Sequence, residues 1–202
     1  MTLNLEEGAS LVRYSREVIA SRFKGKKPGI PENLRKIFSE KRGVFVTLHK
    51  YPDNQLRGCI GYPEPVLKLG DAVRESAHSA AFGDPRFKNL EENELNSIVI
   101  EVSVLTLPEL IVVEKPVGYV KAVKVGRDGL IIDDGMLRGL LLPQVAVEQG
   151  WDAETFLSQT CVKAGLTPDC WLLKGIRVYK FSAQIFSEET PNGDVVEKAL
   201  TD

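Results

Sequence analysis

The chain has 202 residues, with 26 Lys or Arg against 28 Asp or Glu, so its formal net charge is −2. A chain of this length folds as one large domain or as two small lobes. Its composition, 43% hydrophobic and 27% charged, is that of an ordinary globular protein and excludes collagen, coiled coils and low-complexity disorder. Nucleic-acid binding is disfavoured, because it needs a basic excess or stripe that a near-neutral chain lacks.

The N-terminus and the cysteines lead us to expect a cytoplasmic protein. The first seven residues are acidic and lack the basic and apolar regions of a signal peptide. The longest apolar runs are too short to span a bilayer, so no membrane association is expected. The three cysteines, Cys59, Cys161 and Cys170, are odd in number and lack metal-ligand spacing, which predicts free thiols in a reducing compartment.

The first half of the chain predicts helices around a hairpin. Apolar residues at steps of three, four and seven predict an amphipathic helix over 5–23, and a proline in the first turn predicts a short helix over 31–38. β-branched and aromatic residues predict a strand over 44–48, which pairs as a hairpin with a strand over 56–60. A narrow stripe of alanines predicts a closely packed helix over 71–81.

The second half predicts a strand, a meander of hairpins, a helix and a long last strand. Side chains alternate strongly over 98–105, which is typical of a strand. Two Asp-Gly pairs predict a meander of strands over 120–142. Asp152 is a good N-cap for a helix over 153–164, and the segment 176–186 predicts one long strand.

These elements indicate an α+β fold, with a mainly antiparallel sheet flanked by helices. We expect a single domain over about 5–190 that is divided into two lobes. The major lobe comprises about 5–105 and 143–190, and a smaller, hairpin-rich lobe comprises about 106–142. A cleft between lobes is a usual place for a small-molecule site, so we expect the functional site there.

The segment 56–61, Leu-Arg-Gly-Cys-Ile-Gly, carries the strongest chemical signal. In a regular strand Arg57, Cys59 and Gly61 share one face, and a guanidinium beside a thiol favours the thiolate and lowers its pKa. Gly58 and Gly61 let a ligand or another backbone come close. The alternative is a buried cysteine that packs as a small hydrophobic residue beside a β-bulge.

A nucleophilic cysteine needs an imidazole within hydrogen-bond reach. The two histidines are His49, at the end of the preceding strand, and His78, on the alanine-rich helix. Either could turn toward Cys59, but neither spacing requires it. No metal site is predicted, because Glu75 and His78 form a single i,i+3 pair where two-metal bundles need two. The chain lacks the common phosphate, dinucleotide and serine-hydrolase motifs, which leaves any cofactor unknown.

Further polar residues are candidates for ligand binding. Asp84 and Arg86 lie in a loop, where they could face a ligand or form an ion pair that fixes the loop. Glu101 lies in the middle of a strand and is either a general acid or base or a charge on a solvated face. Gln144 and Glu148 share a helix face, where they could bind a polar ligand or lie on the surface.

The segment 56–61 resembles the signature of the AMMECR domain family. Further stretches match the family in order and extend the resemblance over about 5–190: 43–48, 80–87, 139–146, 150–152 and 161–166. The resemblance implies a two-lobed α+β fold with a cleft between the lobes, and no established reaction. It transfers these residues as candidates for the site: Arg57, Gly58, Cys59, Gly61, Asp84, Arg86 and Gln144.

Members of the family are often fused to, or encoded near, a Memo-like protein and a radical SAM protein, which the resemblance implies as candidate partners. We expect a cytoplasmic enzyme, or a subunit of one, that acts on a small molecule at a cleft containing Cys59. In this hypothesis Arg57 stabilises the thiolate or binds an anionic substrate. The alternative is a non-catalytic module that uses the same surface to dock a protein or bind a metabolite, and a nucleic-acid regulator ranks third.

Overall fold

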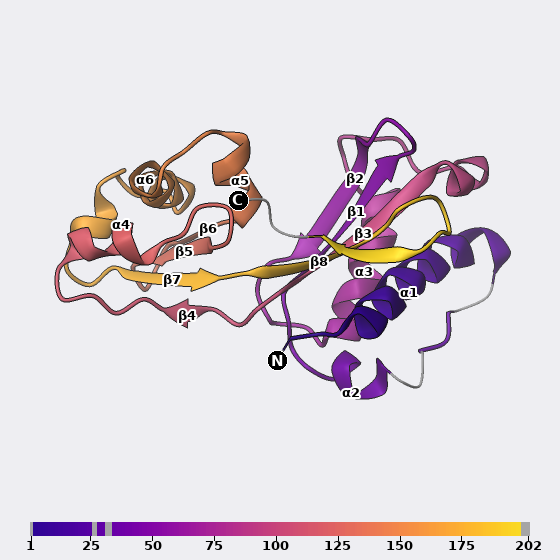
Figure 1. Ribbon diagram of the computed structural model, residues 1–202, viewed down its shortest axis with the longest axis horizontal. Coiled ribbons are helices and arrows are strands. Elements are labelled where there is room, and N and C mark those ends of the chain that lie inside the picture. Colours follow the sequence, from indigo (N-terminus) through magenta and orange to yellow (C-terminus); the bar gives the residue numbers. More distant parts are fainter. Residues whose placement is uncertain (1, 26–27, 31–33, 199–202) are drawn as a thin grey trace. The chain divides into compact units, whose positions relative to one another are not determined.

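The computed structural model describes residues 2–25, 28–30 and 34–198 (Figure 1). Helices and antiparallel strand pairs alternate along the chain, which confirms the predicted α+β class. The chain packs as two compact units: the described residues up to Leu105 with those from Gln184 onward, and Thr106–Ala183. None of the helices in the described part combines the length and the apolar character needed to cross a bilayer.

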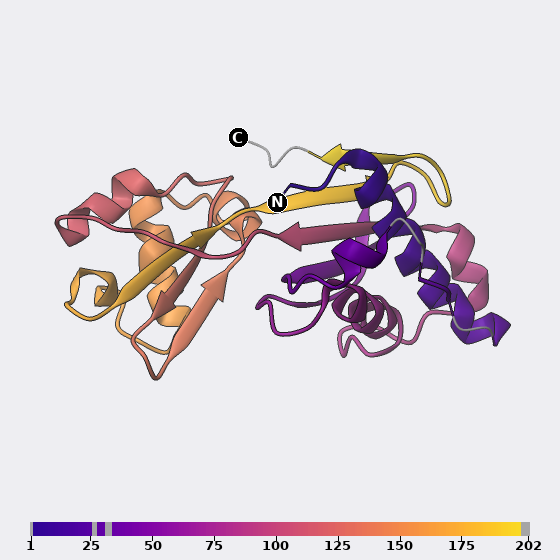
Figure 2. The same cartoon turned by 90° about the horizontal axis from the view of Figure 1, so that it is seen from below.

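The first unit is a sheet packed against helices. Its elements are α1 (Leu5–Lys24), α2 (Arg35–Phe38), β1 (Val44–Lys50), β2 (Gln55–Tyr62), α3 (Leu69–Phe82), β3 (Ile98–Leu105), β8 (Ala183–Glu188) and β9 (Val195–Lys198). The strand order is β2-β1-β3-β8-β9, and β3 and β8 run side by side in Figures 1 and 2. Helix α3 packs on β1 and β2, whereas α1 packs on β3, β9 and α3.

The predicted elements of this unit are confirmed. The helix over 5–23 is α1, which a capping box between Asn4 and Glu7 begins and the left-handed Gly25 ends. The strands expected over 44–48, 56–60 and 98–105 are β1, β2 and β3, and the helix expected over 71–81 is α3. The helix expected over 31–38 is observed as α2, and its first three positions, 31–33, lie outside the described residues.

Alternation along the strands gives the sheet two faces. Val46, Leu48 and Ile100 are fully buried in the core that the sheet forms with α1 and α3. Successive strand residues point to opposite faces, so Thr47 and Glu101 lie on the face turned away from these helices.

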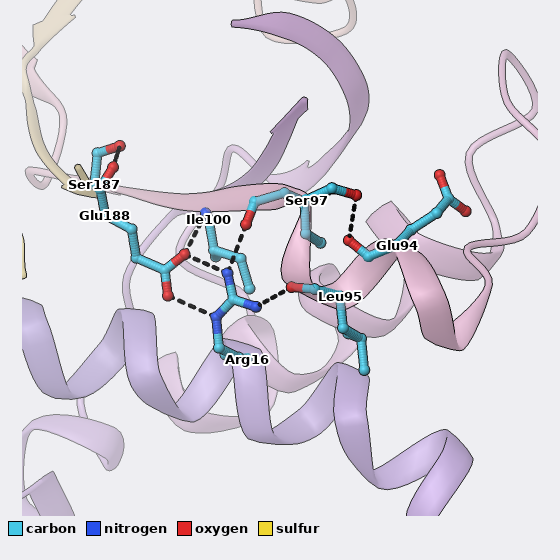
Figure 3. Close-up of polar contacts among 8 residues, drawn as sticks. Arg16, Glu94, Leu95, Ser97, Ile100, Ser187 and Glu188 are labelled. Carbon is cyan, nitrogen blue, oxygen red and sulfur yellow. Dashed lines mark hydrogen bonds and ion pairs between the residues drawn. The ribbon is translucent and has the colours of Figure 1, made fainter. Parts of the chain in front are cut away.

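A buried ion pair ties α1 to the sheet (Figure 3). The Arg16 guanidinium is bidentate on the Glu188 carboxylate, with 2.6 Å from Nε to Oε1, and it also donates to the carbonyl oxygens of Leu95 and Ile98. The backbone N–H of Ile100 donates to the same carboxylate over 2.9 Å. Because these groups satisfy one another out of contact with most solvent, we interpret the cluster as structural.

The second unit is a smaller sheet with helices on it. Its elements are β4 (Glu109–Leu110), α4 (Tyr119–Ala122), β5 (Gly129–Asp133), β6 (Arg138–Leu141), α5 (Pro143–Glu148), α6 (Ala153–Lys163) and β7 (Arg177–Phe181). The strand order is β4-β7-β5-β6, and α6 packs on β5 and β6. Its core includes Phe156 and Leu157 of α6 against Leu130 and Ile132 of β5.

The two units divide the chain differently from the expected lobes. Residues 143–183 belong to the second unit, although we expect 143–190 in the major lobe from the sequence. The physical reason is strand pairing, because β7 pairs with β5 from Gly129↔Phe181 to Asp133↔Arg177. The predicted meander is also shorter than expected, since 119–122 forms α4 and the hairpin is β5–β6.

The single long strand expected over 176–186 is wrong, because the segment forms β7 and β8 in two different sheets. Ser182 separates the two strands. Its N–H donates to the Thr106 hydroxyl over 2.9 Å, and its carbonyl accepts from the Thr106 N–H over 2.8 Å. The two segments that join the units are therefore held together at this point.

The expectation of three free thiols is wrong for two of them. Cys161 on α6 and Cys170 form a disulfide, with their Cα atoms 6.0 Å apart. A left-handed residue, Gly165, turns the chain after α6, so that both sulfurs lie in the core of the second unit. Cys59 is the free cysteine, and it is half-buried.

Candidate functional site around Cys59

Cys59 lies on β2, the edge strand of the first sheet. Strand register pairs Thr47 of β1 with Cys59 on one side and with Glu101 of β3 on the other. The three residues therefore form a row across the face turned away from α1 and α3. The Thr47 hydroxyl donates to Cys59 Sγ over 3.3 Å, and Lys198 Nζ lies 2.7 Å from the Glu101 carboxylate.

The loop after α3 closes the free edge of β2 at Cys59. The Asp84 carboxylate accepts the Cys59 N–H over 2.9 Å, and Arg86 Nη2 donates to the Cys59 carbonyl oxygen over 3.1 Å. A strand at the edge of a sheet leaves such N–H and C=O groups unpaired. Asp84 and Arg86, which we call the edge clamp, thus take the place of a neighbouring strand and fix the Cys59 backbone.

The edge clamp is also an ion pair. Asp84 Oδ1 accepts from Arg86 Nε over 3.0 Å, and Oδ2 accepts from Nη2 over 2.7 Å. The Asp84 side chain is 2% exposed and that of Arg86 is 54% exposed. Hydrogen bonds from Arg86 hold the pKa of the Asp84 carboxyl far below its usual range, and those to Asp84 raise the pKa of Arg86. Both groups therefore stay charged at neutral pH.

The thiol of Cys59 is protonated at rest. Burial raises its pKa, and the Thr47 hydrogen bond and the charge of Arg86 lower it by less. The carboxylates of Asp84 and Glu101 add to the rise. The expectation of a pKa lowered by Arg57 is wrong, because the cation that acts on this sulfur is Arg86.

A β-bulge separates Arg57 from Cys59. Leu48 pairs with Gly58 and His49 pairs with Leu56, so Arg57 is an extra residue on β2. The alternation that would place Arg57 beside Cys59 is broken at this point. A glycine inside a strand is the sequence signal for such a bulge. A bulge here agrees with the alternative prediction for this segment, a cysteine that packs beside a β-bulge.

Arg57 is held by a carboxylate of its own. Its Nε and Nη2 lie 2.8 and 3.0 Å from the two oxygens of Glu94, and its side chain is 8% exposed. The hydrogen bond from Arg57 lowers the pKa of Glu94. Arg57 therefore anchors the segment that follows the edge clamp to β2. The cation that acts on the thiol is Arg86, not Arg57 as expected.

The two glycines of the signature make room for protein atoms. A Cβ on Gly58 would lie 2.1 Å from the carbonyl oxygen of Ala80 in α3, and one on Gly61 would lie 2.3 Å from that of Val44. Close approach of backbone to backbone thus accounts for both positions. Of the expected alternatives, the structure favours packing over contact with a ligand at Gly58 and Gly61.

The remaining candidates lie in different places. His49 follows Thr47 on β1, and its Nδ1 is buried without a hydrogen-bond partner in the described structure. His78 is exposed on α3, with its ring 5.2 Å from that of Phe82. Gln144 lies on α5 of the second unit, where its Oε1 is likewise buried without a partner among the described residues. The cleft between lobes stays a prediction.

Metal-binding side chains do not gather in the described residues, which contain no group of three or more His, Cys, Asp or Glu that could hold an ion. The site is therefore defined by Cys59 with Thr47, Glu101 and the edge clamp. Sequence reasoning missed Thr47, whose only signal is its register opposite Cys59.

The fold and the signature strand place the chain in a known class. A model of the AMMECR1 family matches residues 12–186, and the chain belongs to this family. The match ends before β9, which carries the partner of Glu101.

Three of the proteins similar to this chain come from archaea. Protein MJ0810 of Methanocaldococcus jannaschii is 56% identical over 198 residues, which cover 98% of each chain. A protein of Methanothermobacter thermautotrophicus is 54% identical over 93% of this chain and 97% of its own. The crystal structure of the uncharacterized protein PH0010 from Pyrococcus horikoshii aligns with a TM-score of 0.82 at 47% identity, over 98% of each chain.

Proposed function

We propose that the chain is an enzyme, or a subunit of one, that acts on a small molecule through the thiol of Cys59. The observation that carries the proposal is a half-buried sulfur on a residue whose backbone N–H and C=O are both fixed by the edge clamp. A positioned nucleophile or proton donor needs such a rigid frame, because catalysis loses efficiency when the reacting atom is misplaced.

The surroundings of the sulfur define what it can do. At neutral pH the thiol carries its proton, so a nucleophilic step requires that a base remove it. Glu101 is the carboxylate on the same row and is our candidate for that base, whereas Arg86 would stabilise the thiolate once formed. Thr47 orients the sulfur by its hydrogen bond.

Metabolite turnover tests this proposal. The wild-type protein and Cys59→Ser are each incubated with a small-molecule extract, and mass spectrometry follows which compounds are consumed. We expect the wild type to consume at least one compound that Cys59→Ser leaves intact. Equal consumption by both proteins, or none by either, would contradict a catalytic thiol.

A second candidate function is a non-catalytic module that binds a metabolite or docks a protein at the same residues. The observation that favours it is the raised pKa of Cys59, since a thiol without its charge is a weak nucleophile. A Memo-like or radical SAM protein in the cytoplasm is the partner that we propose for such a module. Partner recovery that Cys59→Ser leaves unchanged, with no compound consumed by either protein, would favour this second function.

A further inference from the structure

We infer that the Cys59 site takes a small molecule with an anionic oxygen group, such as a carboxylate, and that Arg86 binds this group through Nη1. The inference rests on the proposed function, because it names the class of compound that acts on, or is acted on by, the same thiol.

The hydrogen bonds of Arg86 leave one edge of its guanidinium open. Nε and Nη2 donate to Asp84, and Nη2 also donates to the Cys59 carbonyl oxygen. Nη1 makes no hydrogen bond within the described part of the chain, and the Arg86 side chain is 54% exposed, so solvent or a ligand can reach it. Two N–H donors of a fixed, exposed cation that binds the Cys59 backbone are therefore left without a partner among the described residues, and a planar guanidinium suits oxyanions.

The guanidinium is held in place before a ligand arrives. The Asp84 oxygens fix its inner edge, and its Cζ lies 5.5 Å from the centre of the Phe87 ring. A cation–π contact and a bidentate ion pair both restrict the plane of the group. Preorganisation of this kind lowers the entropic cost of binding.

The carboxylates near Arg86 are already partnered. Asp84 is 2% exposed and turns its charge toward β2, and Glu101 is ion-paired with Lys198. The carboxylates of Asp84 and Glu101 are thus neutralised by their own partners, and their repulsion of an anion at Arg86 is reduced. Nη1 of Arg57 also lacks a hydrogen-bond partner among the described residues, but it is buried, since the Arg57 side chain is 8% exposed and bound to Glu94.

The test compares two alkylating reagents of nearly equal size. Iodoacetate is an anion and iodoacetamide is neutral, and in both cases the thiolate sulfur displaces iodide from the CH₂ carbon while the thiol proton passes to buffer. The ratio of the two rate constants at Cys59 cancels changes in the pKa or exposure of the thiol. Mass spectrometry confirms that the label is on Cys59, since Cys161 and Cys170 are joined in a disulfide.

We expect Arg86→Gln to lower the iodoacetate-to-iodoacetamide ratio by about threefold or more, the factor for two unit charges a few ångström apart in water. Arg86→Lys keeps the charge and retains most of the ratio. The control Arg74→Gln removes an exposed arginine that pairs with Asp71 and Glu75, and it leaves the ratio unchanged. An equal ratio in the wild type and Arg86→Gln would overturn the inference.

A salt series on the wild type needs no variant. Screening by salt predicts that the ratio falls as sodium chloride rises from low to about 1 M, and a ratio independent of salt would again overturn the inference. Failure of the proposed function has a different result. In that case the ratio still depends on Arg86, while Cys59→Ser and the wild type consume the same compounds.

Discussion

Asp84→Asn tests whether the edge clamp stabilises the chain. The variant keeps an oxygen in place of Oδ2, which accepts from the Cys59 N–H and from Arg86 Nη2. It replaces Oδ1 with an amide donor, which cannot accept from Arg86 Nε or from the Arg86 backbone N–H. The charge of a side chain that is 2% exposed is removed at the same time. The change is nearly isosteric, so packing around the loop is preserved.

The expected loss is about 2–3 kcal/mol of unfolding free energy at pH 7. A hydrogen bond to a charged group contributes about 1.5–3 kcal/mol. The Coulomb part of the pair adds at most about 1 kcal/mol, because the Arg86 side chain is 54% exposed and solvent screens its charge.

The loss of unfolding free energy in Asp84→Asn depends on pH, and the pKa of Asp84 determines the direction of this dependence. This pKa is lowered in the folded state, chiefly by hydrogen bonds from Arg86. The contribution of the charge is therefore present above the unfolded pKa of about 3.9, and it is lost as the pH falls through the lower folded value. The difference between wild type and variant is constant from pH 7 to about 5 and shrinks in stronger acid.

Urea unfolding at several pH values measures the difference, with the exposed Asp53→Asn as the matched control. We expect the control to stay within about 0.5 kcal/mol of the wild type. An Asp84→Asn protein as stable as the wild type at pH 7, or a difference that grows in acid, would refute the reasoning.

Three further changes should lower stability, each measured by urea unfolding. Reduction of the Cys161–Cys170 disulfide, whose sequence separation is 9, should cost about 2.7 kcal/mol from chain entropy, and no loss would contradict that bond. Glu188→Gln removes the carboxylate that balances the charge of the buried Arg16 and should cost about 3 kcal/mol or more, so a neutral result would contradict a structural ion pair. Gly58→Ala should cost about 1–3 kcal/mol or more. The control Gly83→Ala should change little, because its Cβ would lie 3.4 Å from the Ser79 carbonyl oxygen, an ordinary contact distance.

Local pattern predicts the elements of this fold well. Alternation over 98–105 and the alanine stripe over 71–81 each give the observed strand and helix, because side-chain period and secondary structure are directly linked. The same period cannot show that 176–186 divides between two sheets. That division depends on which strands pair, and pairing is a long-range property of the chain.

The candidate site was predicted in part. Cys59 and Glu101 do share a row, but only the register through Thr47 brings them together. Regular alternation predicts that Arg57 and Cys59 share one face of β2, and the bulge at Arg57 breaks that alternation. The bonds from the edge clamp to Cys59 span 25 and 27 residues of sequence, which no local pattern encodes.

The pH dependence of Cys59 alkylation by iodoacetamide tests most directly which cation acts on the thiol. We expect a wild-type midpoint above the ordinary thiol value of about 8.5, a higher midpoint for Arg86→Gln, a lower one for Glu101→Gln, and no shift for Arg57→Gln, which removes the charge of Arg57. A wild-type midpoint below that ordinary value, or one that moves with Arg57 and ignores Arg86, would contradict this assignment.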